Sequence, residues 1–561
     1  MGFWNRMRWG GVVCLVALAA VVLVLHLPAE AAKKKVPGTK LIKAKAKLGA
    51  PLEVNATEAA AASAARASEG FAPLAPKEKP FLPTMGQAAY QQAKAAAAAP
   101  APAGKPAPGL APGLAPDMVP ATAPSLTAVN FAGDYNTGWY PPDTHGAAGH
   151  DYYCQIVNSR FSVYDKTGAL LLRVGLDALT GYNTQGLVDP QVLYDPVFRR
   201  WIISVMALPE GVATGPQFYF MLVSQTQDPQ GAWWVYRIDT RGLAGGQFFD
   251  YPHIGQDSRA VIVTANNFNY ATTAWLDSRF FAWPKAWLYN GLPFNYIYTY
   301  NWTYGTIMPP VVLDNNRYSY LVSTNKTGAD NIIKVIAFHT PATPIESGWA
   351  NVYNVSVQAY SLPPSAAQPF TTSLLDTLDS RFVNASTQVG TAPSGAASLF
   401  QTHTVAYDAT YPAPRYYEFI LTPNSGSVRQ WDWFWARASS YDWNASIVAN
   451  RNKDVFVTWS STDPSKEIFP QVRFGGRRSF ADLGTGNFPS TPGLAVSGQA
   501  AATSVDHYDG FRWGDYSSVT IDPAVASGLT AWITNEWAHD NIDPWVSWRS
   551  QIAAITYLPL P

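Results

Sequence analysis

A short layout recurs between about Val129 and the end of the chain. An apolar run ends at an Asp or Asn, and a second run rich in Trp, Ile, Val and Tyr follows, as in "DPQVLYDPVFRRWIISVMA" from Asp189 and "YPHIGQDSRAVIVTANNF" from Tyr251. Asp and Asn suit such a turn because their side chains bond their own backbone and tolerate left-handed geometry. The predicted turn residues of the seven copies are Asp151, Asp195, Asp257, Asp314, Asp408, Asn450 and Asp522.

Each copy, with the apolar runs that follow it, predicts an antiparallel meander of three or four strands. One small sheet cannot cover both of its faces, whereas a ring of sheets buries each face against a neighbour. We therefore predict an all-β fold, a single β-propeller with seven blades, in which aromatic residues (14% of the chain) fill the layers between blades. Because the copies are irregularly spaced, six or eight blades are alternatives to seven. A two-sheet sandwich is disfavoured because it would need far fewer strands.

The first 125 residues differ in composition from the rest. Residues 1–31 are typical of a signal peptide cleaved near Ala31, with Arg6 and Arg8 before an apolar run from Val12 to Leu27. An uncleaved membrane anchor is the alternative. Residues 32–125 are rich in Lys, Ala and Pro, which predicts a disordered spacer, and residues 126–561 are assigned to the propeller.

Four motifs carry a resemblance that covers nearly the whole predicted propeller. They are "PPDTHGAAG" (Pro141–Gly149), "VDPQVLYDPVFRRWI" (Val188–Ile202), "YPHIG" (Tyr251–Gly255) and "RWGDYSSVTIDP" (Arg512–Pro523). The chain resembles a largely uncharacterised group of secreted bacterial β-propeller-type proteins. The resemblance implies export and a propeller fold, and it carries no established activity or catalytic residues.

In a propeller the first strand of each blade lines the central channel, and its first residues lie near one mouth. Counting back from the turns, we expect a ligand site at this mouth. Its predicted members are Asp143, His145, Asp250, His253, His403 and Trp513. Oxygen ligands suit Ca²⁺, so a metal site is predicted at Asp143, Asp189 and Asp515. The alternative is that these side chains cap strand ends and bond the backbone of neighbouring blades.

The stretch "RWGDYSS" offers the strongest catalytic candidates. Asp515 and Glu536 could act as paired carboxylates in glycoside hydrolysis, with Arg512 beside them. The competing interpretation is an ion pair between Asp515 and Arg512, with Trp513 packed against a neighbouring blade. The sequence contains no H-E-x-x-H, G-x-S-x-G or P-loop motif, which disfavours the common hydrolase and nucleotide-binding classes.

Two aromatic stretches allow a sugar-stacking surface or buried packing between blades. One is Phe268–Thr306, and the other contains Trp431, Trp433 and Trp435, whose alternation places them on one face of a strand. Packing is the commoner outcome for both.

The sequence favours an exported, non-enzymatic binding head that recognises extracellular or cell-surface polysaccharide or protein. A polysaccharide-active hydrolase or lyase and a structural envelope protein are the alternatives. Net charge is zero, which argues against a nucleic-acid partner, and we expect a monomer with no membrane span in the mature chain. Cys154 is the single Cys after the predicted signal, so a disulfide framework is excluded.

Overall fold

We analysed a computed structural model of the 561-residue chain. It divides into residues 1–39 and 40–561, and every described residue belongs to the second unit. The predicted signal peptide lies outside the described residues. Within the described part, no helix combines the length and apolarity needed to cross a membrane. The described ranges are 40–43, 46–68, 77–79, 81–97, 123–135, 137–210, 215–240, 247–299, 302–339, 347–390, 395–479, 493–502, 512–539 and 548–558.

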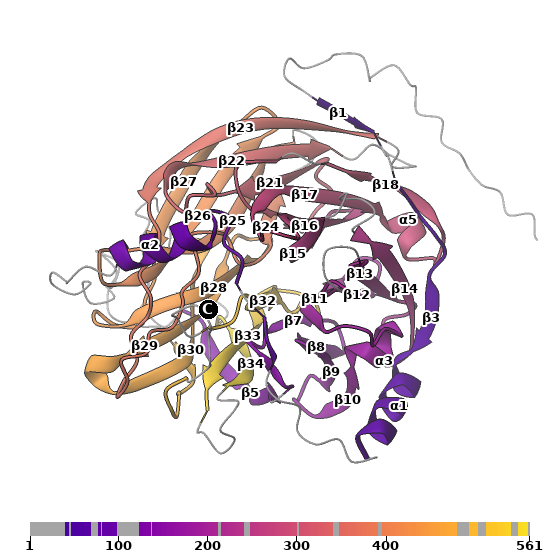
Figure 1. The fold of residues 1–561 in the computed structure, drawn as a ribbon, viewed down its shortest axis with the longest axis horizontal. Helices are drawn as coiled ribbons and strands as arrows, with labels where there is room; N and C mark the ends of the chain where they lie inside the picture. Colours follow the sequence, from indigo (N-terminus) through magenta and orange to yellow (C-terminus); the bar gives the residue numbers. More distant parts are fainter. Residues whose placement is uncertain are drawn as a thin grey trace, which may run out of the picture. The chain divides into compact units, whose positions relative to one another are not determined.

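The described strands form successive antiparallel meanders, so the predicted all-β class is confirmed (Figure 1). The first three meanders contain β7 (His145–Ala148), β8 (Tyr152–Val157), β9 (Arg160–Asp165) and β10 (Leu170–Gly175); β11 (Leu187–Asp195), β12 (Arg200–Ala207), β13 (Phe218–Ser224) and β14 (Ala232–Asp239); and β15 (Gln247–Gln256), β16 (Ala260–Asn269), β17 (Trp275–Pro284) and β18 (Phe294–Tyr298). The short helices α3 (Leu176–Thr180) and α5 (Lys285–Leu288) follow β10 and β17.

The later meanders repeat the same order. They contain β19 (Ile307–Met308), β20 (Pro310–Val312), β21 (Tyr318–Ser323), β22 (Asp330–His339) and β23 (Ser347–Tyr360); β24 (Ser386–Gly390), β25 (Ala397–Ala406), β26 (Pro412–Thr422) and β27 (Ser425–Trp433); β28 (Tyr441–Ala449), β29 (Val455–Asp463), β30 (Ile468–Arg477) and β31 (Gly493–Val496); and β32 (Ser518–Ile521), β33 (Thr530–Ala538) and β34 (Trp548–Thr556). A 3₁₀ turn, η3 (Pro464–Lys466), joins β29 to β30.

The last meander takes its fourth strand from the other end of this unit. Strand β5 (Ser125–Tyr135) precedes the first meander in sequence, yet it pairs antiparallel with β34. Ile552 lies opposite Phe131, and Ala553 lies opposite Asn130. This pairing ties the beginning of the repeated region to its end.

The predicted turns are confirmed in all copies except the fifth. Asp151, Asp195, Asp257, Asp314, Asn450 and Asp522 each lie at the connection between the first and second strands of a meander, with β20 counted as first in the fourth. Asp408 instead joins β25 to β26, because β24 is the first strand of that meander. The fifth copy therefore begins one strand earlier than the sequence predicted.

The first strands lie next to one another around a common centre. Each first strand contacts the next one in the order β7, β11, β15, β20, β24, β28 and β32, and β32 contacts β7. Among the described first strands, hydrogen-bonded pairing joins β15, β20 and β24, which run parallel and merge two meanders into a ten-stranded sheet. Gly255 permits this approach, because a Cβ there would lie 2.3 Å from the Pro310 carbonyl oxygen.

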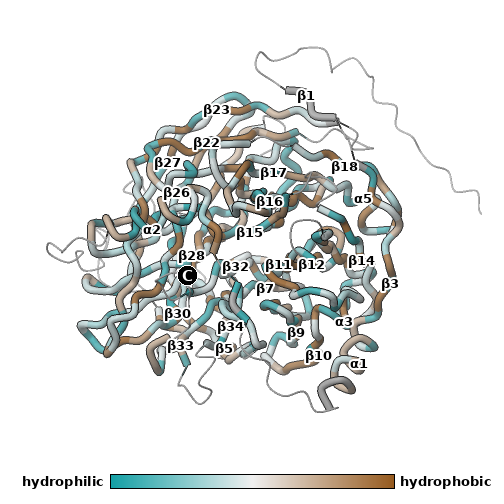
Figure 2. The backbone as a smooth tube through the Cα atoms, viewed as in Figure 1, coloured by the Kyte–Doolittle hydropathy of each residue, from teal (hydrophilic) through white to brown (hydrophobic). Residues whose placement is uncertain are grey.

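Neighbouring meanders bury their faces against each other. One core joins Ile202 and Tyr219 of the second meander to Phe281 and Trp283 of the third. Figure 2 shows hydrophobic stretches recurring along the strands, separated by hydrophilic ones.

The two aromatic stretches mainly supply this packing. Phe280, Phe294 and Tyr296 of the first stretch are buried. In the second stretch, Trp431 and Trp433 pack against the core shared by the fourth and fifth meanders, while Trp435 lies beyond the end of β27.

Part of the expected spacer is ordered, which differs from the prediction of disorder over residues 32–125. Strands β1 (Lys40–Lys43), β2 (Ala46–Leu48) and β3 (Leu52–Asn55) pair with β23, β18 and β14, the outer strands of three meanders. Helix α1 (Ala56–Ser68) lies beside β10 and α3. The reason is that an exposed sheet edge offers unpaired backbone groups, which can order a segment of little hydrophobicity. Residues 98–122 lie outside the described residues.

Candidate functional site

An unusual backbone feature recurs within or just before four of the first strands. Asp143, Asp189, Tyr251 and Asn444 have φ values of 52°, 54°, 56° and 51°, in the left-handed region that residues other than glycine rarely adopt. In the second, third and sixth meanders the residue lies at a break in strand register typical of a β-bulge. A bulge redirects a side chain, and here Asp143 and Asp189 become neighbours at the centre.

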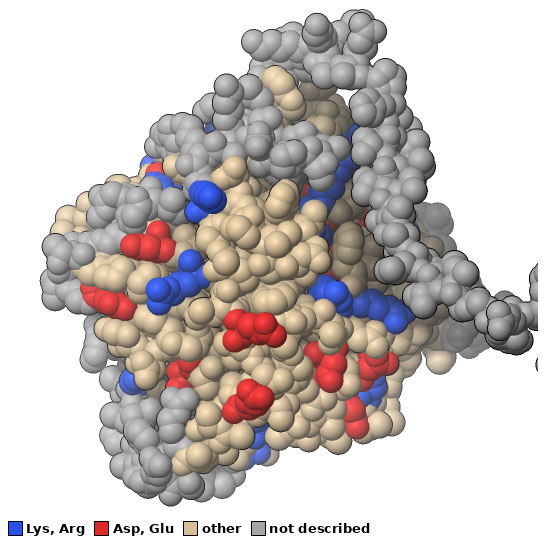
Figure 3. Space-filling view, turned by 90° about the vertical axis from the view of Figure 1, so that its right-hand side faces the viewer, with Lys and Arg blue, Asp and Glu red and all other residues tan. Residues whose placement is uncertain are grey.

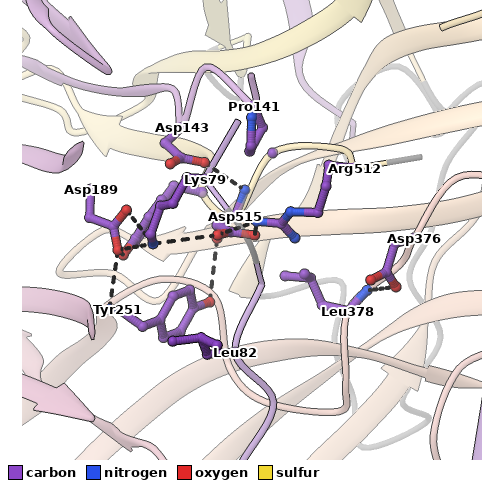
Figure 4. Close-up of polar contacts among 12 residues, drawn as sticks. Lys79, Leu82, Pro141, Asp143, Asp189, Tyr251, Asp376, Leu378, Arg512 and Asp515 are labelled. Carbon is purple, nitrogen blue, oxygen red and sulfur yellow. Dashed lines mark hydrogen bonds and ion pairs between the residues drawn. The ribbon is translucent and has the colours of Figure 1, made fainter. Parts of the chain in front are cut away.

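A lysine from the N-terminal region lies among these carboxylates (Figure 4). We call residues 77–97 the plug segment; it contains β4 (Lys77–Glu78) and α2 (Gln87–Ala97). Lys79 Nζ lies 2.5 Å from Asp189, 3.0 Å from Asp250 and 3.9 Å from Asp515. All four side chains are buried, so these ion pairs are shielded from water.

The carboxylates also hold neighbouring strands together. Asp143 accepts hydrogen bonds from the Asp515 backbone N–H at 3.1 Å and from Asn158 Nδ2 at 2.7 Å. Asp189 accepts from the Tyr251 N–H and the Tyr516 hydroxyl, both at 3.1 Å. These contacts match the strand-capping alternative raised by the sequence.

Burial and mutual repulsion raise the pKa values of several acids in this cluster. Burial, with Asp515 and Asp189 nearby, raises the pKa of Asp143 well above its ordinary value. Burial, opposed by Lys79, raises the pKa of Asp189 to about 6. Burial by itself lowers the pKa of Lys79, but Asp189, Asp250 and Asp515 outweigh it and hold the pKa above its ordinary value. Lys79 is therefore charged within this cluster.

Asp143, Asp189 and Asp515, at which the sequence predicted a calcium site, all lie in this cluster. Among the described residues, no group of three or more His, Cys, Asp or Glu is arranged to hold a metal ion. The physical reason is that the Lys79 ammonium and the Arg512 guanidinium already supply positive charge to these carboxylates.

The catalytic candidates occupy the same buried cluster. Arg512 Nη2 donates to both oxygens of Asp515 at 2.7 Å, which is the predicted ion pair. Glu536, on β33, is buried and accepts a hydrogen bond from the Gly514 N–H, and burial raises its pKa well above the ordinary value. Trp513 donates from Nε1 to Ser460 Oγ at 3.0 Å and packs edge-on against Trp443 of the preceding meander. None of these side chains is open to solvent.

Two of the three predicted ligand histidines form a polar layer between first strands. His145 Nδ1 accepts from the Val192 N–H at 3.3 Å, and its Nε2 lies 3.3 Å from Asn384 Oδ1. His253 Nδ1 lies 3.0 Å from Gln191 Nε2. Burial lowers the pKa of His145 to about 4 and that of His253 well below its ordinary value. Both rings are therefore neutral and connect adjacent strands.

His403 lies elsewhere, which follows from the shifted fifth copy. It is on β25, a second strand, where Nδ1 lies 2.8 Å from the Ser380 carbonyl oxygen and Nε2 lies 3.2 Å from the Tyr417 hydroxyl. Burial lowers its pKa to about 3. It is a core histidine of the fifth meander.

An open pocket of about 990 Å³ lies at the other end of the first strands, beside the turns. Its inner wall is lined by small and apolar side chains, and its rim by turn residues. Representative wall residues are Ala147, Ala148, Leu193, Val312, Ala385, Ile447 and Val519, and representative rim residues are Phe198, Ser258, Asn315, Arg451, Asn452 and Ser527. The ligand site was predicted at the strand starts, whereas most of the pocket lies toward the strand ends, and His145 is the predicted ligand residue that lines it.

The turn acids at this rim have two structural tasks. Asp257 Oδ1 accepts from the Arg259 and Ala260 N–H groups at 2.7 Å, while Oδ2 accepts from Ser319 of the next meander at 2.7 Å. Asp195 likewise caps its own turn and pairs with Lys285 of the next meander at 2.5 Å. One oxygen thus forms the turn and the other joins the neighbouring sheet.

Sequence reasoning missed the residues that fill the closed end. Lys79, Phe81 and Tyr90 were assigned to a spacer because Pro and Ala dominate their surroundings. The signal that could have found them is the short apolar interruption "PFLPTM" from Pro80, which a purely disordered spacer does not need. Arg381 and Asp376, which contact this segment, lie in the long connection between β23 and β24.

Comparisons with known proteins give only distant likenesses. No protein-family model and no curated protein sequence matches the chain. Among solved structures, an α-L-arabinanase from Penicillium chrysogenum complexed with arabinobiose is 10% identical with a TM-score of 0.32, covering 78% of this chain and 97% of its own. An exo-β-1,3-galactanase from Clostridium thermocellum is 10% identical with a TM-score of 0.30, covering 76% and 91%. The parainfluenza virus 5 hemagglutinin-neuraminidase ectodomain is 10% identical with a TM-score of 0.34, covering 64% and 86%. TM-scores this low do not assign a common fold or function.

Proposed function

We propose that the chain is an exported seven-bladed β-propeller that binds extracellular or cell-surface polysaccharide in the pocket beside the turns. The observation that carries the proposal is the pocket of about 990 Å³, which is open, polar at its rim and apolar along its wall. A sugar ring has hydroxyls at its edge and an apolar face, so it needs both kinds of surface.

The rim residues fit a neutral polar ligand. Asn315, Asn452 and Ser527 offer exposed amide and hydroxyl groups, and Phe198 presents an aromatic ring that is 47% exposed. Asp195 and Lys285 neutralise each other across adjacent meanders. Figure 3 draws the molecule turned by 90° from the view of Figure 1, and on that side Lys, Arg, Asp and Glu are scattered over a mostly uncharged surface.

The arrangement of the acids supports binding over hydrolysis. Asp515 and Glu536, the proposed catalytic pair, are buried at the closed end, away from the pocket. The rim residues Asp195, Asp257 and Asp522 accept hydrogen bonds from backbone amides of their own turns. A glycosidase needs two carboxyl groups that reach the glycosidic bond from opposite sides. A surface protein as the partner and a structural envelope role are the alternatives, and a monomeric state and a cleaved signal peptide are parts of the proposal.

The experiment is a glycan array probed with the full-length secreted protein, followed by incubation of each bound glycan with the protein and measurement of newly formed reducing ends. The proposal expects binding to a limited set of glycans with no new reducing ends. Release of reducing ends would support the hydrolase alternative. If the protein binds none of the glycans on the array, the proposal is contradicted and a protein partner becomes the favoured alternative.

A further inference from the structure

We propose that the closed end of the channel is a peptide-binding site for a lysine followed two residues later by a phenylalanine, and that the plug segment occupies it as an intramolecular ligand. Asp189, Asp250 and Asp515 are not among the residues that line the pocket of the proposed function, so the two sites are separate. Either proposal can fail without the other.

The lysine subsite is a cage of carboxylates contributed by different meanders. Asp189, Asp250 and Asp515 surround Lys79 Nζ at 2.5, 3.0 and 3.9 Å. Arg512 already pairs with Asp515, so Lys79 is the cation beside Asp189 and Asp250, which would otherwise be buried acids with little water around them. A primary ammonium is a compact charge with several donors, which suits two carboxylates at hydrogen-bonding distance.

The phenylalanine subsite is a pair of guanidinium groups. The Phe81 ring lies 4.6 Å from Arg381 Cζ and 5.2 Å from Arg512 Cζ. Each arginine is held by an acid of the body, since Arg381 pairs with Asp379 at 2.6 Å and Arg512 pairs with Asp515 at 2.7 Å. Both pairs form between residues of the body and orient the two guanidinium groups, and Arg381 Nη2 also donates to the Leu82 carbonyl oxygen of the plug segment at 3.4 Å.

A third contact anchors the helical part of the segment. On α2, the Tyr90 hydroxyl donates to Asp376 Oδ1 at 2.6 Å, and Lys94 Nζ donates to the Pro363 carbonyl oxygen at 2.9 Å and to Thr377 Oγ1 at 2.8 Å. These partners lie in the connection between β23 and β24. The segment is thus held by side chains set into discrete subsites, as a bound peptide is.

The plug segment adds little to the sheets themselves. Its one described strand, β4, pairs over two residues with β6 (Trp139–Tyr140), and neither belongs to a meander. Strands β5 and β7–β34 pair among themselves to form the meanders, whose outer edges also receive β1–β3. The segment joins the rest of the chain through residues 69–76 and 98–122, outside the described residues, and the second of these has the Pro/Ala composition of a linker.

The test uses the full-length chain with protease sites introduced in residues 69–76 and 98–122. After cleavage, gel filtration and mass spectrometry measure how much plug segment remains with the body. We expect retention in the wild type and at least a tenfold weaker association in Lys79→Met. Lys77→Met is the matched control, because Lys77 is exposed. The plug segment that carries Lys77→Met should remain with the body as the wild-type segment does. Loss of the wild-type segment, or equal retention of all three, would overturn the proposal.

A second measurement covers the case in which Lys79→Met does not fold. The cleaved wild-type protein is incubated with an isotope-labelled synthetic peptide of residues 77–97, or with the same peptide carrying Lys79→Met. The labelled wild-type peptide should replace the bound segment at least tenfold more effectively than the variant peptide. Equal replacement by both would refute the lysine subsite. Replacement by neither would show that the segment is a permanent part of the fold.

Discussion

Lys79 Nζ lies 2.5 Å from the carboxylate of Asp189, although 110 residues separate them in the sequence. Both side chains are buried at the centre of the described unit. The pair joins the N-terminal plug segment to the first strand of the second meander, and Asp250 and Asp515 complete its surroundings. The predicted ligand residues Asp189, Asp250 and Asp515 therefore bind a lysine of the same chain.

Replacing Lys79 should strongly destabilise the protein. Lys79→Met removes the cation that pairs with the buried carboxylates of Asp189 and Asp250, which costs about 3–5 kcal/mol. Denaturant unfolding of the full-length protein measures the change. Lys77→Met, at an exposed position, should change the free energy of unfolding by less than about 0.5 kcal/mol. Similar values for the two variants would show that the carboxylate cage does not depend on Lys79.

Turn acids that also contact the next meander should contribute more to the free energy of unfolding than turn acids that do not, and Asp257 and Asp151 allow this comparison. Asp257→Ala removes acceptors for two backbone N–H groups and for Ser319, so we expect a loss of about 2 kcal/mol. Asp151→Ala, at the exposed turn of the first meander, should cost less than about 0.5 kcal/mol. Urea unfolding of both variants provides the comparison. An equal cost would mean that neither the turn hydrogen bonds of Asp257 nor its contact with Ser319 contributes to stability.

The buried His403 predicts a specific pH dependence. Because its pKa falls from 6.5 to about 3 on folding, the unfolded chain takes up a proton below pH 6.5 while the folded protein does not. Stability contributed by neutral His403 is therefore present above pH 6.5 and lost as the pH falls. The stability advantage of the wild type over His403→Gln should shrink by about 1.4 kcal/mol per pH unit between about pH 6 and pH 4. An advantage independent of pH would contradict a neutral, buried ring.

The sequence predicted the repeated meanders because their signals are local. A turn residue such as Asp195 bonds its own backbone, and the flanking apolar runs need only their neighbours. The same reasoning failed for Asp408, because β25 and β26 resemble a first and a second strand in composition. The alternation of apolar and polar residues and the positions of turn residues do not reveal which strand of a meander lies nearest the centre.

The carboxylates of the candidate site could be predicted from the sequence, but the lysine that pairs with them could not. Asp143, Asp189, Asp250 and Asp515 converge as expected from strand counting. Their burial depends on Lys79, which comes from a segment whose composition indicates disorder. A single lysine acting at long range leaves no periodic signal, so only the three-dimensional arrangement identifies it as the cation.

Calorimetric titration of a glycan identified on the array tests the central claim, that the pocket beside the turns is the binding site. Phe198→Ala removes the aromatic ring at the rim, and Phe370→Ala removes a ring that is 79% exposed outside the pocket. The account predicts that Phe198→Ala raises Kd about tenfold, equivalent to about 1.4 kcal/mol, while Phe370→Ala leaves it unchanged. Unchanged affinity in Phe198→Ala together with weaker binding in Phe370→Ala would contradict it.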